Sequence, residues 1–173
     1  MNENFFPQQV ISELEFNVPV FDEMLKHTTS EMQQWKPAAD KWCLLEIVCH
    51  LRDEETDDFR ARLHHVLTTP ALPMPAIDPL ALVTERQYME QNYDEVLAQF
   101  MSERKKSLVW LRSLQSPDYS QAYIHPKFGA LSGKLFLTNW LAHDYLHLRQ
   151  ITKLKFDFLK HKTGDGLRYA GEW

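Results

Sequence analysis

The chain has 173 residues, 44% of them hydrophobic and 25% charged, a composition typical of one soluble globular domain. Its 24 acidic and 19 basic residues give a formal net charge of −5, which excludes the basic surface of a DNA- or RNA-binding domain. No apolar run is long enough to cross a bilayer and the N-terminus lacks a signal pattern, so we expect a cytoplasmic protein that binds neither nucleic acid nor membranes.

The first expected helix begins after Pro7 and ends by about Gln34. Proline suits the first turn of a helix, where no N–H donor is needed. Pro19 does not suit a helix interior, so we expect a kink or break near Val18. Apolar residues recur at helical spacing along this stretch, at Val10, Leu14, Val18, Phe21 and Leu25.

A second helix is expected over residues 43–67, after a loop bounded by two tryptophans. His50 lies at the edge of its apolar stripe, and Glu46 and Glu54 lie one turn to either side of this histidine. The helix therefore carries an acidic line centred on a histidine beside its apolar face. A solvated acidic face explains the same pattern, and the helix alone does not decide between the two.

Residues 68–79 contain four prolines and form too long and stiff a stretch for a tight helical hairpin. We expect an extended Pro-rich crossover between helices two and three, passing across the end of a bundle. Asp78 followed by Pro79 predicts the N-terminus of a short helix after this crossover.

The third long helix is expected to begin at Asn92, which has a glutamate three residues later, and to end near Leu114. Its methionine and aromatic residues recur at core spacing. The basic run at 104–106 lies within this helix, and we interpret it as a solvated face. Residues 116–133 look irregular, with two prolines and a glycine.

The last long helix, expected over residues 136–151 and capped by Ser132, carries His143 and His147 four residues apart on one face. A buried imidazole needs partners for its nitrogens, and one metal ion can bind both rings. Two core histidines hydrogen-bonded to protein groups are the alternative. The same face carries Phe136, Trp140, Ile151 and Leu154.

Four long amphipathic helices with one long connection predict an all-α four-helix bundle over residues 1–160, followed by a polar, glycine-containing tail at 161–173. If helices two and four are neighbours, His50, His143 and His147 converge. Three imidazoles leave a coordination position of a divalent ion open, which is typical of a catalytic or substrate-binding site.

Short motifs along the chain occur in the order and at about the spacing of a known family: Trp35-Lys36-Pro37, Lys41-Trp42, Glu46, His50-Leu51, His125-Pro126, Phe128-Gly129, His143, His147 and Gln150. By these residues the chain resembles the DinB-like superfamily, in its DinB-2 (DinB/YfiT-like) form, from about residue 35 to residue 151. The resemblance implies a metal triad of His50, His143 and His147, with nickel or zinc bound. It also implies a metal-dependent hydrolase or a transferase that uses a low-molecular-weight thiol, acting on a small molecule, and a possible homodimer.

Cys43 departs from the family pattern, which often has serine or threonine at this position. We expect a buried thiol there and no disulfide with Cys49, because the two lie on different faces of one helix. His125 matches a loop position of the family and is not expected to bind metal. Glu46 and Glu54 are the candidates for proton transfer.

Two alternatives to an enzyme stay open at this point. The chain can be a stress-response protein that binds a metal and a small ligand without turnover, or a structural bundle whose histidines belong to the core. The first alternative predicts a stoichiometric metal, and the second predicts none.

Overall fold

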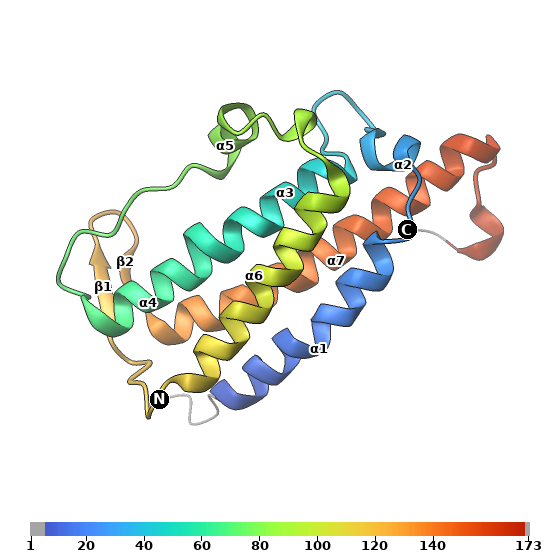
Figure 1. The fold of residues 1–173 in the computed structure, drawn as a ribbon. Helices are drawn as coiled ribbons and strands as arrows, with labels where there is room; N and C mark the ends of the chain where they lie inside the picture. The colour runs from blue at the N-terminus through green and yellow to red at the C-terminus, as the bar shows by residue number, and fades with distance from the viewer. Residues whose placement is uncertain (1–5, 172–173) are drawn as a thin grey trace.

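The computed structural model describes residues 6–171 as a bundle of four long helical rods (Figure 1). The first rod is α1 (Pro7–Leu25), and the third is α6 (Tyr93–Ser113). The second rod is α3 (Leu44–Asp53), a π-helical segment (Glu54–Arg60) and α4 (Ala61–Thr68), and the fourth is α7 (Gly133–Thr163). The predicted helical bundle is confirmed. Within the described residues no helix combines the length and apolarity needed to cross a membrane.

The rods do not simply alternate in direction. In Figure 1, α1 and α7 run from lower left to upper right, whereas the α3–α4 rod and α6 both run the opposite way. The chain between α4 and α6 therefore returns along the length of the bundle. It passes through an irregular stretch that includes Pro70, Pro73 and Pro75, then α5 (Pro79–Glu85) and a 3-10 turn (Tyr88–Glu90).

The first rod differs from its prediction. Helix α1 continues through Pro19 and ends at Leu25, and a separate short helix, α2 (Ser30–Gln34), follows. The helix does not break near Val18 because Pro19 lies on the exposed side, where water can satisfy the carbonyl that loses its N–H partner.

The predicted helix starts are confirmed by their side-chain caps. The Asp78 carboxylate accepts from the N–H groups of Leu80 and Ala81 at the start of α5. The Asn92 side chain caps α6 through the N–H of Glu95, and the Ser132 hydroxyl caps α7. These short-range signals depend only on the local chain, which explains why the sequence reveals them.

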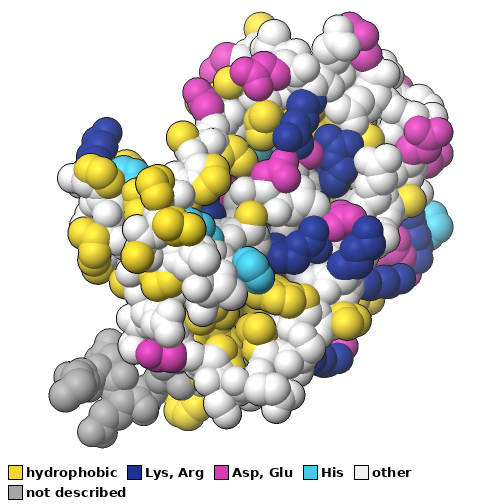
Figure 2. Space-filling view, turned by 60° about the vertical axis from the view of Figure 1, so that its left-hand side comes forward, with side chains coloured by type: hydrophobic (Ala, Val, Ile, Leu, Met, Phe, Trp, Pro, Cys, Tyr) yellow, Lys and Arg dark blue, Asp and Glu magenta, His cyan; other side chains and the backbone are white. Residues whose placement is uncertain are grey.

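The segment at 116–133 is less irregular than expected. It contains a β-hairpin of β1 (Ala122–His125) and β2 (Gly129–Ser132), paired antiparallel. Helix α7 begins directly after β2 and continues to Thr163, past residue 161, where the polar tail was expected. A 3-10 turn (Arg168–Ala170) lies near the C-terminus. Figure 2 brings the hairpin end of the bundle forward and shows hydrophobic side chains gathered on a lobe at the left.

Two clusters of buried hydrophobic side chains form the core, one toward each end of the bundle. On α1, Leu14 belongs to one cluster and Phe21 to the other, with buried Asn17 between them. On α7, Trp140 and Ile151 are separated in the same way by Asp144 and His147. A layer of buried polar side chains thus divides the core in the middle of the bundle.

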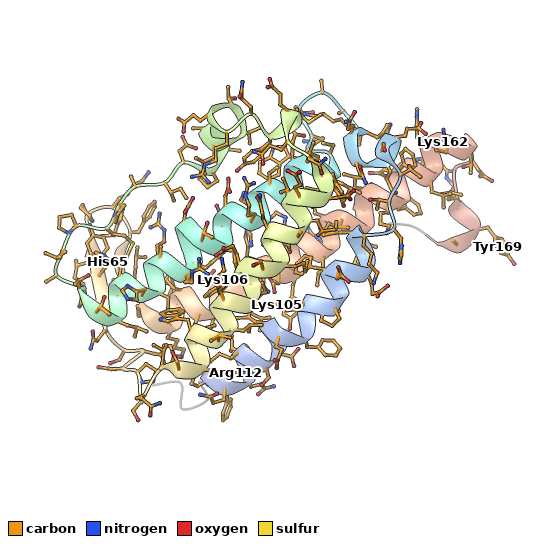
Figure 3. The ribbon with its side chains drawn as sticks, viewed as in Figure 1. His65, Lys105, Lys106, Arg112, Lys162 and Tyr169 are labelled. Carbon is orange, nitrogen blue, oxygen red and sulfur yellow. The ribbon has the colours of Figure 1, made fainter. Side chains whose placement is uncertain are left out.

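Arg104 occupies the centre of this polar layer, and the expectation that the whole run at 104–106 is a solvated face is wrong. Its side chain is buried, whereas Lys105 and Lys106 are exposed (Figure 3). The guanidinium forms a bidentate pair with Asp144, with both N–O distances 2.7 Å, and donates from Nε to Glu55 at 2.9 Å. A buried charge is tolerated only when it is paired in this manner.

The Arg104 network ties all four rods together. Asn17 of α1 donates to the Asp144 carboxylate at 3.0 Å, and the Trp140 indole N–H of α7 donates to Glu55 at 3.0 Å. Glu55 itself comes from the π-helical segment and Arg104 from α6. The network therefore fixes the relative positions of the rods at the level where the histidines lie.

Candidate metal centre

The three candidate histidines meet in the polar layer. The Nε2 atom of His143 lies 3.2 Å from Nε2 of His50 and 3.0 Å from Nε2 of His147. Each residue offers one ligand nitrogen, and these three atoms all lie within 4.8 Å of one another. The α3–α4 rod supplies one imidazole and α7 supplies the other two, so the second and fourth rods are neighbours here, as the convergence of the three histidines requires.

The spacing of the nitrogens fits a single metal ion. Two imidazole nitrogens bound to zinc at 2.0–2.1 Å with tetrahedral angles lie roughly 3.3 Å apart. The two Nε2 separations of 3.2 and 3.0 Å are close to this value. Core histidines that pair with carbonyl or carboxylate groups would instead direct Nε2 toward those groups.

All three rings are held neutral, which is the state that binds metal. Burial, together with a smaller effect of the neighbouring rings, lowers the pKa of His50 to about 3 and that of His143 to about 2. Burial also lowers the pKa of His147. Arg104 adds a small contribution at His143, because its positive charge lies in the same layer.

The outer nitrogens of the triad have few partners. The Nδ1 atom of His50 lies 3.8 Å from Oε1 of Glu54, within ion-pair range but beyond a hydrogen bond, and both atoms are buried. Burial and the nearby Asp58 raise the pKa of Glu54 to about 8. A carboxylate behind a metal-binding histidine typically holds the proton on Nδ1 and leaves Nε2 free as a ligand. Glu54 is placed for that role.

Aromatic rings surround the triad. The Trp42 ring packs against His50 with the ring centroids 4.9 Å apart, and the Phe59 ring lies 5.0 Å from that of His143. A cavity of about 930 Å³ opens beside His147, between the loop before α3 and one side of α7. This cavity is large enough for a small molecule and also contains Trp42 and Gln150 in its wall.

Glu46 lies apart from the triad and stabilises the start of α3. One of its carboxylate oxygens accepts from the backbone N–H of Cys43 at 2.9 Å, and the other accepts from Lys36 at 2.7 Å. Of the two glutamates that the sequence singles out, the structure therefore brings only Glu54 to the histidines.

The remaining candidates have other surroundings. Cys43 is buried, with its Sγ 3.5 Å from Sδ of Met89, and burial raises the pKa of its thiol to about 11. His125 lies in the hairpin, where its Nδ1 accepts from the N–H groups of Lys127 and Phe128. The sequence does not single out Glu55, whose burial depends on the π-helical segment and on Arg104.

Comparison with known proteins shows that this fold also occurs in a solved structure. A search of curated proteins finds no match. Among solved structures, the chain is similar to YfiT from Bacillus subtilis, which is described as a probable metal-dependent hydrolase with an unusual four-helix bundle topology. The two chains are 18% identical with a TM-score of 0.77, and the match covers 95% of this chain and 93% of YfiT. At this level of identity the likeness establishes the fold alone.

The sequence itself identifies the family. The profile of the DinB superfamily matches residues 13–151, a stretch that contains all three histidines and most of the bundle. The chain therefore belongs to the DinB superfamily.

Proposed function

We propose that the protein binds one divalent metal ion through Nε2 of His50, His143 and His147 and catalyses hydrolysis of a small molecule at this site. The observation that carries the proposal is the convergence of three buried, neutral imidazoles on one point. Lone pairs on facing nitrogens repel one another, and a shared cation removes that repulsion. Imidazole ligands suit nickel and zinc, which are the metals we expect.

Three protein ligands leave room for a substrate, and the cavity beside His147 supplies the space. When bound, a divalent ion lowers the pKa of water or of a thiol toward neutrality and polarises a substrate oxygen. Glu54 lies 3.8 Å from Nδ1 of His50, and its pKa, raised to about 8, suits a side chain that exchanges a proton near neutral pH. Trp42 and Phe59 limit access of bulk water to the rings.

Metal binding by the three histidines is tested by elemental analysis, which compares the metal content of the purified wild-type protein with that of the variants His50→Ala and His147→Ala. His125→Ala is the matched control, because it removes an imidazole from the hairpin. We expect one ion per chain in the wild type and the control and little in the other two variants. Equal metal content in all four proteins would contradict the proposal that these histidines bind the metal.

The reaction is tested separately on the metal-loaded protein. Panels of esters, amides and phosphates test hydrolysis, and electrophiles supplied with a low-molecular-weight thiol test the related transfer reaction. Turnover that disappears with a chelator and returns with nickel or zinc supports an enzyme. A stoichiometric metal, ligand-dependent thermal stabilisation and no turnover in any panel would instead support the non-catalytic binding protein.

A further inference from the structure

The cavity beside His147 has a cationic wall. Lys41 from the loop before α3 and Arg149 and Lys153 from α7 line it, and Asp157 is the one acidic residue among its described lining residues. The chain as a whole carries five more acidic than basic residues. The positive charge at the cavity is therefore a local feature that opposes the net charge of the molecule.

Arg149 is the cation best placed to bind a ligand. Lys153 is paired with Asp157, and Lys41 is paired with the adjacent Asp40. Arg149 is exposed, and within residues 6–171 no ion pair or hydrogen bond of its guanidinium is found. A guanidinium presents a planar set of N–H donors that matches the two oxygens of a carboxylate.

The rest of the wall is largely apolar and leads to the triad. Trp42 lines the cavity and also packs against His50, while Leu146 and Leu154 contribute aliphatic surface from α7. His147 belongs both to the cavity wall and to the three-histidine cluster. A molecule in this cavity therefore contacts an apolar surface, has a cation at one side, and lies against His147 of the triad.

We infer that the ligand of this cavity is a small organic acid with an apolar body, whose carboxylate pairs with Arg149 while the body packs on Trp42. The inference deepens the proposed function, on which it rests for the reaction itself. The acid group then lies away from the triad and orients the opposite end of the molecule toward the histidines. Neutral molecules of the same shape lose the pairing with Arg149.

Binding of two matched probes tests this inference. The probes are 2-naphthoate and 2-naphthamide, which share size and aromatic surface but differ in charge. Their affinities are measured by calorimetry on chelator-treated protein, so that no metal contributes to carboxylate binding. We expect naphthoate to bind about fivefold more tightly than naphthamide, the effect of one partly exposed ion pair, and the preference to shrink in high salt.

Two variants test whether Arg149 is the residue that causes the preference for naphthoate. Arg149→Gln is expected to bind both probes equally, whereas Lys105→Gln, which removes an equal charge from an exposed site on α6 (Figure 3), is expected to keep the fivefold preference. Undetectable or equal binding of naphthoate by the wild type, or an unchanged preference in Arg149→Gln, would overturn the inference. Loss of metal binding with the preference intact would instead overturn only the proposed function.

Discussion

Two pairs of consecutive residues connect the histidine cluster to the Arg104 network. Glu54 lies near His50 while Glu55 pairs with Arg104, and His143 joins the cluster while Asp144 pairs with the same guanidinium. In each pair, the first side chain lies at the histidine cluster and the second belongs to the Arg104 network. Single substitutions in this layer should therefore separate metal binding from stability.

Glu54→Gln tests the role of the carboxylate behind His50. At pH 9, above the Glu54 pKa of about 8, the wild-type side chain is a carboxylate and attracts the Nδ1 proton more strongly than a neutral amide does. We therefore expect metal affinity at this pH to fall by about tenfold, at the lower end of the range for such partners. Competition with a chromophoric chelator measures the affinity. Glu46→Gln is the control, because its carboxylate serves the start of α3, and a similar loss in that variant would contradict the assignment.

Asp144→Asn tests the buried network. The substitution removes one of the two carboxylates that pair with the buried Arg104 and leaves Glu55 as its charged partner. Because charge-assisted hydrogen bonds to the guanidinium are weakened, we expect the free energy of unfolding to fall by about 2 kcal/mol. Urea denaturation of the metal-free proteins measures it. Asp22→Asn, which affects an exposed ion pair with Lys26, should change stability by less than about 0.5 kcal/mol.

At the scale of elements, the π-helical segment and the continuous α1 are the two departures from regular helix behaviour. A π-helical turn inserts an extra residue per turn, and here it allows the consecutive Glu54 and Glu55 both to be buried. In α1 the irregularity is Pro19, which removes one backbone hydrogen bond without ending the helix. The first irregularity contributes Glu54 and Glu55 to the polar layer, whereas the second lies on the exposed side of α1.

Pro19→Ala is therefore expected to stabilise the protein. The alanine restores an N–H donor in the helix interior, and we expect a gain of about 1–3 kcal/mol in the free energy of unfolding. Denaturant unfolding measures the gain. Pro79→Ala is the matched control, since Pro79 occupies the first turn of α5, where no donor is needed, and no gain is expected there. Equal effects of the two substitutions would contradict the explanation.

At the scale of the whole molecule, the bundle divides its interior into two apolar clusters separated by one polar layer. The apolar clusters hold weak acids in a non-aqueous environment, and burial raises the pKa of Cys43 to about 11, of Cys49 to about 12 and of Tyr93 to about 12. Both thiols are consequently neutral at physiological pH. The homodimer implied by the family resemblance stays a prediction at this scale.

These raised pKa values predict an alkaline loss of stability. The unfolded chain ionises its cysteines near 9.0 and its tyrosines near 10.0, before the folded protein does, so it binds fewer protons above pH 9. The free energy of unfolding should then decrease steadily from about pH 9 to pH 11. Urea midpoints across this range measure the decrease, and Cys49→Ala should make it shallower. A midpoint independent of pH would contradict the burial of these groups.

The local features of the protein were determined by sequence alone. The apolar periodicity of α7, the caps at Asp78, Asn92 and Ser132, and the four-residue spacing of His143 and His147 all depend on residues within one or two turns. Such signals remain readable without knowing the neighbours of a helix. His50 lies at the edge of the apolar stripe of the second expected helix, and the family resemblance also implies it as the third member of the triad. The structure places it beside the other two histidines.

Only the tertiary structure decided which charged side chains are buried. Arg104 and its exposed neighbours look alike in a basic run, and Glu54 and Glu55 look alike in an acidic one, because the sequence does not state which residue of another rod supplies the opposite charge. Burying a charge depends on a partner brought close by packing. Helical periodicity also assumes 3.6 residues per turn, an assumption that the π-helical segment at 54–60 does not meet.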